Sequence, residues 1–346
     1  MKARTYVVLI GAIAGTVIAQ ENLPPGRPPP EEALKRFDKN GDGKISRDEA
    51  PDRMARHFDE IDANHDGFIT LDELKAHDAK MESGGTTAPA MTNRVSISIE
   101  GDFRVIRANG IPNHDSGKFP NRNNPNAIRE ISAVYRVPVK QKMNDKPMPT
   151  GVSWFGIALN GVTFEPGTQE FFNEDRNSGW NYEAIGGTSN LGIDMNNAHV
   201  QPNGQYHYHS TPVGLVAKLG GDTNRMLLVG WAADGFPIYT ANGFSDPKDA
   251  KSAVRKMKSS YRLKEGVRPS GPGFKYDGRF TEDFEFVKGS GDLDECNGRF
   301  SVTPEFPEGI YCYFITDEFP RISRFWRGVA DPSFNKHGPP PGQRRF

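Results

Sequence analysis

The pattern of apolar and polar positions divides the chain into three kinds of segment. Residues 6–18 form a continuous apolar run, and residues 31–80 carry apolar side chains at helical spacing. Residues 94–331 consist of short apolar runs interrupted by Gly, Pro and Asn. Spacing near 3.6 residues indicates amphipathic helices, whereas alternation or short apolar runs indicate strands. The pattern predicts a small all-α module followed by a larger, mainly β domain.

The expected β domain has the texture of a compact, sandwich-like fold. Residues 95–99 and 155–159 place large apolar side chains at every second position, and residues 226–231 form an apolar run typical of a buried strand. Within this part only residues 249–258 have the pattern of a helix. Many short strands separated by turn residues favour a sandwich or a related β architecture.

Two twelve-residue stretches in the helical part, residues 38–49 and 62–73, place side-chain oxygens at positions 1, 3, 5, 9 and 12 and glycine at position 6. Six to eight oxygen ligands in flexible geometry suit Ca²⁺. A turn region that binds nothing is the alternative, but every ligand position matches twice. The expected ligands, with a backbone carbonyl at position 7, are Asp38, Asn40, Asp42, Lys44, Ser46 and Glu49 in one loop, and Asp62, Asn64, Asp66, Phe68, Thr70 and Glu73 in the other.

These residues resemble the EF-hand family, in two copies. Ile45 and Ile69 stand at position 8, where paired EF-hands form a short strand contact. Only residues 50–61 separate the two loops, which leaves about three helical turns for both connecting helices. The resemblance implies two Ca²⁺ sites in a compact pair of hands that has little room to open.

The N-terminus has the features of an export signal. Lys2 and Arg4 precede the apolar run, and Val17-Ile18-Ala19 before Gln20 is a small-residue cleavage site. A membrane anchor is the alternative, but the run is shorter than a full span. We therefore expect a secreted or periplasmic protein with no stable membrane span after cleavage. The expected organisation is signal peptide 1–19, Pro-rich lead 20–30, EF-hand pair 31–80, linker 81–93, β-rich domain 94–331 and Pro-rich tail 332–346.

Charge and cysteine content narrow the interpretation further. The chain has 43 basic and 44 acidic residues, and this near-neutral balance gives no electrostatic indication of binding to nucleic acid or to an anionic membrane. Cys296 and Cys312 are the only cysteines, and we expect a disulfide between them because an exported protein reaches an oxidising compartment. Two free thiols, or thiolates bound to a metal, are the alternatives.

The candidate chemistry concentrates in residues 198–209, which hold three of the eight histidines. In a strand with a period of two, His207 and His209 share one face and the intervening tyrosines take the other. The turn Pro202-Asn203-Gly204 can return His199 to the same face. Three imidazoles with an open position suit Zn²⁺ or Cu²⁺. The alternatives are hydrogen-bonded core histidines, or acid–base groups without a metal.

Two aspartates in nearby turn-rich segments are candidates to support this site. Asp194 precedes His199 by five residues, and Asp234 follows the apolar run 226–231 at the expected end of a strand. A carboxylate that orients an imidazole commonly accompanies metal-binding histidines. The alternative for each is the cap of an Asx-type turn.

A second resemblance covers residues 151–325. The motifs that carry it are Tyr206-His207-Tyr208-His209, Gly161–Phe164, Asp194–His199, Asp234–Tyr239, Asp292–Gly298 and Gly309–Asp317. Together, and in their order along the chain, these motifs resemble the bacterial YHYH protein family. This family is a domain of unknown function, so the resemblance implies no activity. The second aromatic motif, residues 311–314, has no histidine. If the family uses two histidine clusters, this chain keeps one.

Two functions follow as competing hypotheses. In the first, an exported calcium-binding protein uses its β domain to bind a ligand, and the aromatic content of 10% suits a carbohydrate or peptide. In the second, the domain is a metal-dependent hydrolase or oxidoreductase that uses His199, His207 and His209. No nucleophile elbow, dinucleotide fingerprint or phosphate loop is present in the sequence. We favour the binding protein with a metal-competent site.

Overall fold

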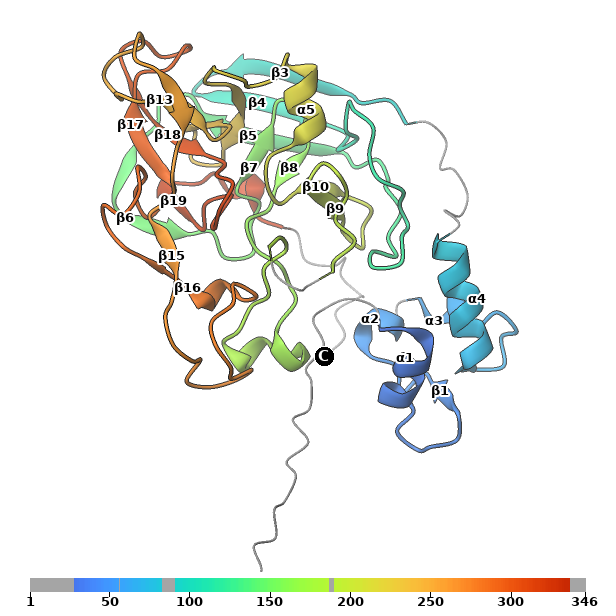
Figure 1. Cartoon of the computed structure of the whole chain (residues 1–346). Helices are drawn as coiled ribbons and strands as arrows, with labels where there is room; N and C mark the ends of the chain where they lie inside the picture. The colour runs from blue at the N-terminus through green and yellow to red at the C-terminus, as the bar shows by residue number, and fades with distance from the viewer. Residues whose placement is uncertain (1–27, 56, 83–90, 187–189, 337–346) are drawn as a thin grey trace, which may run out of the picture.

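The computed structural model shows a small N-terminal module beside a larger β-rich part (Figure 1). The expected signal peptide, its cleavage site, and most of the Pro-rich lead and of the linker lie outside the described residues. Within the described part, no helix combines the length and apolar character that a membrane crossing requires. The described residues are 28–55, 57–82, 91–186 and 190–336.

The N-terminal module, residues 30–82, contains short helices and one small sheet. The two strands pair antiparallel with Ile45 opposite Ile69, as expected for position 8 of paired loops. Both isoleucines are fully buried in a small core with Ala33, Phe58 and Leu74. The elements are α1 (Pro30–Phe37), β1 (Lys44–Ser46), α2 (Asp52–Ala55), α3 (Phe58–Ile61), β2 (Phe68–Thr70) and α4 (Leu71–Glu82).

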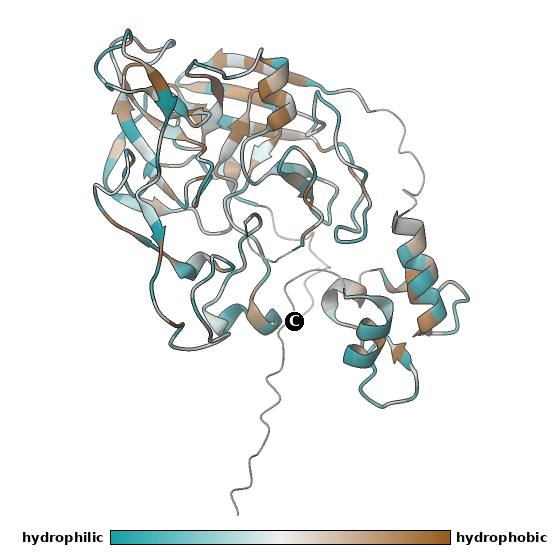
Figure 2. Cartoon of the chain, viewed as in Figure 1, coloured by the Kyte–Doolittle hydropathy of each residue, from teal (hydrophilic) through white to brown (hydrophobic). Residues whose placement is uncertain are grey.

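The larger part is mainly β, as predicted. Figure 2 shows α1 as mainly hydrophilic, whereas apolar residues recur along the strands of the larger part. Its strands are β3 (Val95–Glu100), β4 (Phe103–Ala108), β5 (Ala133–Pro138), β6 (Met143–Pro149), β7 (Gly156–Ala158), β8 (Thr163–Phe164), β9 (Ala198–Val200), β10 (Tyr206–Tyr208), β11 (Leu228–Ala232), β12 (Pro237–Tyr239), β13 (Asn242–Phe244), β14 (Val254–Lys256), β15 (Tyr261–Leu263), β16 (Phe284–Phe286), β17 (Gly298–Ser301), β18 (Ile310–Phe314) and β19 (Phe325–Gly328). Its helical elements are η1 (Phe172–Glu174), η2 (Arg176–Ser178), α5 (Val213–Lys218), η3 (Thr281–Asp283) and η4 (Pro332–Phe334).

One mixed sheet of eight strands organises this part, in the order β17-β18-β12-β11-β7-β8-β10-β9. A three-stranded sheet, β3-β4-β5, packs on it, because Ile106 and Tyr135 share one buried core with Ile157, Tyr208 and Trp231. The layered packing resembles the expected sandwich. The large sheet, however, is mixed rather than purely antiparallel.

The predicted helix over residues 249–258 is wrong. The segment forms turns and then strand β14, which pairs antiparallel with β13. The carboxylates of Asp246 and Asp249 accept hydrogen bonds from the backbone N–H groups of Lys248 and Lys251, each at 2.8 Å. Such Asx turns compete with helical hydrogen bonds, and here they prevail.

The eight-stranded sheet has two halves with matching connectivity. Outward from the central pair β7·β11, the first half runs β7-β8-β10-β9 and the second half runs β11-β12-β18-β17. In both halves the successive pairings are antiparallel, parallel and antiparallel. The two halves are therefore related by an approximate twofold axis through the central pair.

Individual residues obey the same symmetry. At the centre, Ile157 pairs with Trp231, and Gly156 and Gly230 occupy equivalent positions on either side. A Cβ atom on Gly156 would lie 2.4 Å from the Trp231 carbonyl oxygen, and one on Gly230 would lie 2.4 Å from that of Ile157. Both positions exclude a side chain for the same reason, which is the close approach of the two central strands.

The outer strands share a further feature, a partly buried aspartate that accepts a hydrogen bond from a tyrosine. Tyr206 donates to Asp194 Oδ2 at 2.7 Å, and Tyr311 donates to Asp294 Oδ2 at 3.0 Å. Each aspartate also accepts hydrogen bonds from the backbone of the turn that leads into β9 or β17. The Tyr–Asp pairs thus fix the two outer hairpins in the same way.

Candidate metal centre and calcium loops

The β9–β10 hairpin brings three histidines together. His207 pairs directly with His199 across the hairpin, and His209 follows one residue after β10. The expected turn is present: Gly204 has φ 92°, and its N–H donates to the Gln201 carbonyl at 2.8 Å. The histidine cluster, defined as His199, His207 and His209, therefore forms as the period of two and the turn predicted.

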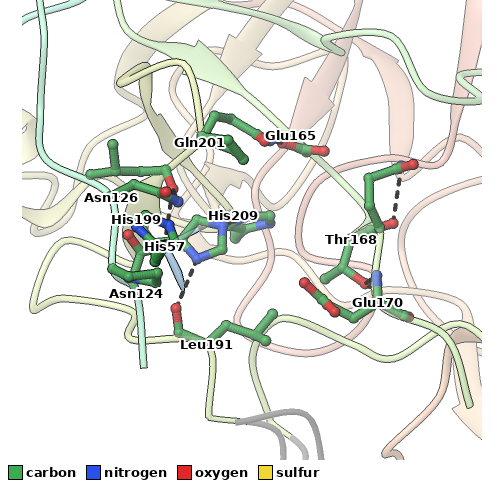
Figure 3. Close-up of a pocket in the computed structure, with 14 residues that line it drawn as sticks. His57, Asn124, Asn126, Glu165, Thr168, Glu170, Leu191, His199, Gln201 and His209 are labelled. Atoms are coloured by element: carbon green, nitrogen blue, oxygen red, sulfur yellow. Dashed lines mark hydrogen bonds between the residues drawn. The ribbon is translucent and has the colours of Figure 1, made fainter. Parts of the chain in front are cut away.

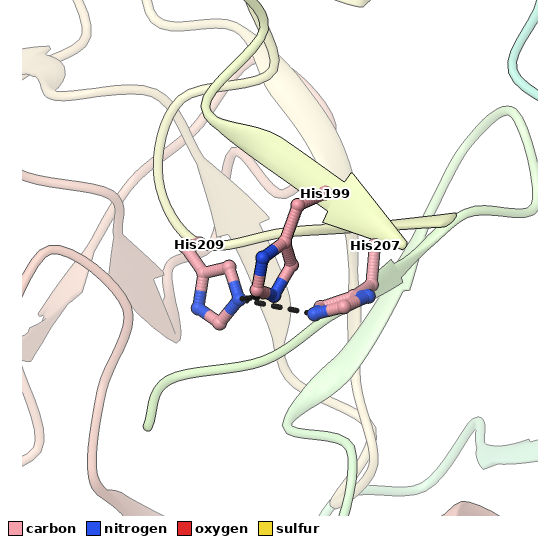
Figure 4. Close-up of side chains that lie close together, drawn as sticks. All are labelled: His199, His207 and His209. Atoms are coloured by element: carbon pink, nitrogen blue, oxygen red, sulfur yellow. Dashed lines mark hydrogen bonds between the residues drawn. The ribbon is translucent and has the colours of Figure 1, made fainter. Parts of the chain in front are cut away.

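The ring nitrogens of the histidine cluster converge on one point (Figure 4). Nε2 of His209 lies 3.0 Å from Nε2 of His207 and 3.0 Å from Nε2 of His199. All three candidate ligand atoms lie within 4.8 Å of one another. Two bonds of about 2.1 Å to one ion span at most about 4.2 Å, so the 3.0 Å pairs fit a shared ion.

The remaining hydrogen bonds indicate which ring nitrogens carry protons. Nδ1 of His199 lies 2.9 Å from the Leu191 carbonyl oxygen, and Nδ1 of His207 lies 3.2 Å from that of Gln205. A carbonyl only accepts, so Nδ1 carries the proton and Nε2 presents a lone pair. His209 can donate from Nε2 to one of these lone pairs at most, and its buried Nδ1 has no partner among the described residues.

Burial keeps the inner imidazoles neutral. His207 is fully buried and His209 is 3% exposed, whereas His199 is only partly buried. Burial, followed by the nearby Lys336 charge, lowers the pKa of His207 to about 3. Burial also lowers the pKa of His209 well below its usual value, with the neighbouring imidazoles adding to the effect. Neutral imidazoles are the form that binds a metal.

A carboxylate that the sequence analysis did not select adjoins the cluster. Glu165, immediately after β8, is 4% exposed and places Oε2 3.1 Å from Nε2 of His207. Gln201 donates to the same oxygen at 2.8 Å, and Lys336 forms an ion pair with the other carboxylate oxygen. Because Nε2 of His207 is an acceptor in the assigned tautomer, two acceptors face each other here. A cation bound to the three histidines would offset that repulsion.

The two aspartates chosen from the sequence lie elsewhere. Asp194 binds Tyr206 and backbone N–H groups on the face opposite the histidines, so it does not orient an imidazole. Asp234 accepts from the Tyr313 hydroxyl at 2.5 Å and from the Gly328 N–H at 2.8 Å, in the second half. Both aspartates hold turns and strands in place, which agrees with the alternative of a turn-capping role rather than a role beside the histidines.

A small pocket opens onto the exposed side of the cluster (Figure 3). His199 and His209 form part of its wall, and no Phe, Tyr or Trp lines it among the described residues. The pocket therefore offers hydrogen-bonding groups and charge rather than a stacking surface. Its polar lining includes Asn124, Asn126, Glu165, Thr168, Glu170 and Gln201.

The equivalent place in the second half holds no histidine. By the register of the hairpins, Arg299 corresponds to His199, Cys312 to His207, and Phe314 to His209. Cys312 and Phe314 belong there to an apolar cluster with Tyr239. The same backbone geometry thus forms with side chains that cannot make a three-histidine site.

The predicted disulfide is wrong. Cys296 and Cys312 are both fully buried free thiols. Cys296 packs on the core face with Tyr311 and Tyr313, whereas Cys312 alternates with these tyrosines along β18 and packs in the other cluster. Burial raises the pKa of both thiols above the usual range. The two sulfurs therefore lie on opposite faces of the sheet, and neither joins the histidine cluster.

The two expected calcium loops are ordered by their own carboxylates. Glu49 accepts from the Ser46 N–H at 2.9 Å and the Ser46 hydroxyl at 2.7 Å, and Glu73 accepts from Thr70 at 2.9 and 2.8 Å. Hydrogen bonds from Ser46 lower the pKa of Glu49 to about 2. The position-12 glutamates are thus held over their loops as anions, the form that Ca²⁺ requires.

Two family models match the chain. The EF-hand model matches residues 31–49 and 55–76, which places the N-terminal module in a class associated with calcium binding. The model described as YHYH protein matches residues 134–328, more than half of the chain. The chain therefore belongs to the YHYH protein family and carries EF-hands before that domain, in the order that the sequence motifs indicated. No curated protein and no solved structure matches it.

Proposed function

We propose that this is an exported protein that binds two Ca²⁺ ions in its N-terminal module and one Zn²⁺ or Cu²⁺ ion at the histidine cluster, beside a polar ligand-binding pocket. The export step rests on the sequence of residues 1–19. The two Ca²⁺ sites rest on the complete ligand pattern of residues 38–49 and 62–73.

The convergence of three Nε2 atoms carries the proposal for the transition metal. Nε2 of His209 lies 3.0 Å from Nε2 of both His207 and His199, and the Nδ1–H groups of these two residues face backbone carbonyls. The Nε2 lone pairs of His199 and His207 are therefore directed to the centre of the cluster. A shared cation would accept them with bonds of ordinary length.

The second half of the sheet supports a chemical role for the histidines. Arg299, Cys312 and Phe314 occupy the equivalent positions within the same backbone geometry. The fold therefore does not need histidine at these positions. This favours a chemical role for the three neighbouring imidazoles over a purely structural one.

The pocket favours a small polar ligand over a stacked sugar. The aromatic residues that suggested a carbohydrate surface are largely buried, and the pocket wall is made of amides, acids and imidazoles. A ligand that donates and accepts hydrogen bonds, such as a peptide backbone or carboxylate group, suits that lining.

Glu165 favours a second candidate, metal-dependent hydrolysis. When bound, Zn²⁺ would supply Lewis-acid polarisation of a carbonyl or of water. Glu165 Oε2 is a buried carboxylate oxygen 3.1 Å from His207, and Gln201 and Lys336 hold it in place. It is therefore positioned to accept a proton from a water molecule in the pocket.

Titration of the chelator-treated protein with Zn²⁺, Cu²⁺ and Co²⁺ by calorimetry tests the proposal. One site per chain that is lost in His207→Ala and kept in Tyr206→Phe is the expected result. Glu165→Gln separates the two candidates, because a binding protein would keep its ligand affinity and a hydrolase would lose turnover while retaining metal. Absence of any transition-metal site would overturn both.

A further inference from the structure

The N-terminal module contributes to the wall of the pocket that leads to the histidine cluster. His57, immediately before α3, lines this pocket together with His199 and His209 (Figure 3). His57 lies in the segment between the two calcium loops. The module that carries the proposed calcium sites therefore borders the pocket of the proposed transition-metal site through His57.

Two ion pairs join the module to segments that are close in sequence to the lining of the pocket. Ion pairs between the module and the β-rich part are Arg36–Glu174 at 3.9 Å and Asp78–Arg122 at 3.7 Å. Glu174 closely follows the lining residues 168–170, and Arg122 closely precedes the lining residues 124–126. The module is thus joined to the chain next to the pocket on both sides of its lining segments, and His57 is the module residue that reaches the pocket itself.

The two ion pairs differ in exposure. The Arg36 and Glu174 side chains are 45% and 63% exposed, so solvent screens their pair and it contributes little. The Asp78 side chain is only 9% exposed, and its ion pair with Arg122 is long at 3.7 Å. The position of His57 depends on these contacts and also on the internal order of the module.

One short helix connects His57 to the second calcium loop. The His57 carbonyl accepts hydrogen bonds from Glu60 N at 3.0 Å and Ile61 N at 3.1 Å. Asp62 N donates to the Phe58 carbonyl at 2.8 Å, and Asp62 is the first expected ligand of the second loop. Continuous backbone hydrogen bonds through α3 thus connect Asp62 of the calcium loop rigidly to His57 of the pocket.

We propose that Ca²⁺ in the second loop holds α3 and His57 over the entrance and so slows the exchange of the transition metal at the histidine cluster. The proposal rests on the proposed function, and it adds regulation of that site by calcium. His57 acts as a gate residue and not as a ligand, because its ring is not among the nitrogens that converge. Gates of this kind change rates of entry and release.

The test measures the release of Zn²⁺ from the full mature chain to a chromogenic chelator that binds Zn²⁺ far more tightly than Ca²⁺. Saturating Ca²⁺ should slow release at least about fivefold, the lower end of typical coupling between sites. His57→Ala and Glu73→Gln should both release Zn²⁺ quickly with or without Ca²⁺. The matched control, Lys35→Ala on the exposed surface of α1, should behave as the wild type.

Each outcome bears on one claim. Equal release rates with and without Ca²⁺ in a wild type that retains Zn²⁺ would overturn the coupling and leave the proposed function intact. A calcium effect that persists in His57→Ala would overturn the role of His57. A wild type that retains no Zn²⁺ would contradict the proposed function itself.

Discussion

His207 and Cys312 occupy equivalent positions in the two halves of the eight-stranded sheet. His207 pairs with His199 across one outer hairpin, and Cys312 pairs with Arg299 across the other. In both hairpins the residue is flanked by buried tyrosines. The framework is therefore common to the two halves, and the histidines are an addition to one of them.

The first prediction exchanges a histidine for its counterpart, His209→Phe, after Phe314. Removing the hydrogen-bond partner of a metal ligand typically weakens metal affinity about 10–100-fold. Removing the ligand itself should weaken Zn²⁺ binding by more than this. Without metal, the free energy of unfolding of the variant should lie within about 2 kcal/mol of that of the wild type. The removal of the unpaired buried Nδ1 offsets the cost of packing the larger phenylalanine ring. Calorimetry and urea unfolding in chelator measure the two effects. Unchanged Zn²⁺ affinity would exclude His209 as a ligand.

The second prediction is that Asp194→Ala and Asp294→Ala destabilise the protein by similar amounts, about 2–5 kcal/mol. Each variant removes the acceptor of a tyrosine hydroxyl and of two backbone N–H groups in its turn, and each buried donor left unpaired costs about 1–3 kcal/mol. Zn²⁺ content per folded molecule should not change. Loss of Zn²⁺ in Asp194→Ala at normal stability would instead make Asp194 part of the site.

The third prediction concerns pH and Asp234. Burial raises the pKa of this carboxyl from 3.8 to about 6 in the folded protein. The folded state therefore holds the proton more tightly than the unfolded state, so the contribution of Asp234 to stability falls as pH rises from about 4 to 6. The free energy of unfolding of Asp234→Asn, relative to that of the wild type, should therefore increase by up to about 3 kcal/mol as the pH rises from 4 to 7. Urea unfolding across this range measures it, and a difference that does not vary with pH would refute the assignment.

The fourth prediction is that Glu49→Gln and Glu73→Gln each remove one Ca²⁺ site. Each change takes a charge from the bidentate ligand at position 12 of its loop. The wild type should bind two ions with dissociation constants between about 10⁻⁶ and 10⁻³ M. Calorimetry that detects no Ca²⁺ binding up to millimolar concentration would contradict the loops as sites.

The fifth prediction is that labelling under denaturing, non-reducing conditions finds two thiols per chain. Cys296 and Cys312 are free and buried, so the native protein should label only slowly. A denatured chain without reactive thiols would restore the disulfide that the structure excludes.

Local rules were sufficient for part of the site. The period of two placed His207 and His209 on one face, and the turn at residues 202–204 returned His199 to them. Glu165 could not be found in this way, because it reaches the cluster through the parallel pairing of β8 with β10, which are distant in sequence. The similarity of residues 156–164 to residues 230–238 is a signal of the repeated halves, but it does not point to Glu165, because Tyr239 stands at the equivalent position.

The errors have equally specific causes. Alternation along β18 already sets Cys312 on the face opposite Tyr311 and Tyr313, but the disulfide was inferred from cysteine number and compartment alone. The helix over residues 249–258 was inferred from the pattern of apolar and polar positions, whereas the side chains of Asp246 and Asp249 close turns there.

The stoichiometry of bound metal tests the central claim most directly. Elemental analysis of the mature protein purified without chelator should find about one Zn or Cu per chain in addition to calcium, and His209→Phe prepared in parallel should lose the transition metal and keep the calcium. Wild-type protein that contains calcium alone, and takes up no transition metal on titration, would contradict the assignment of His199, His207 and His209 as a metal centre.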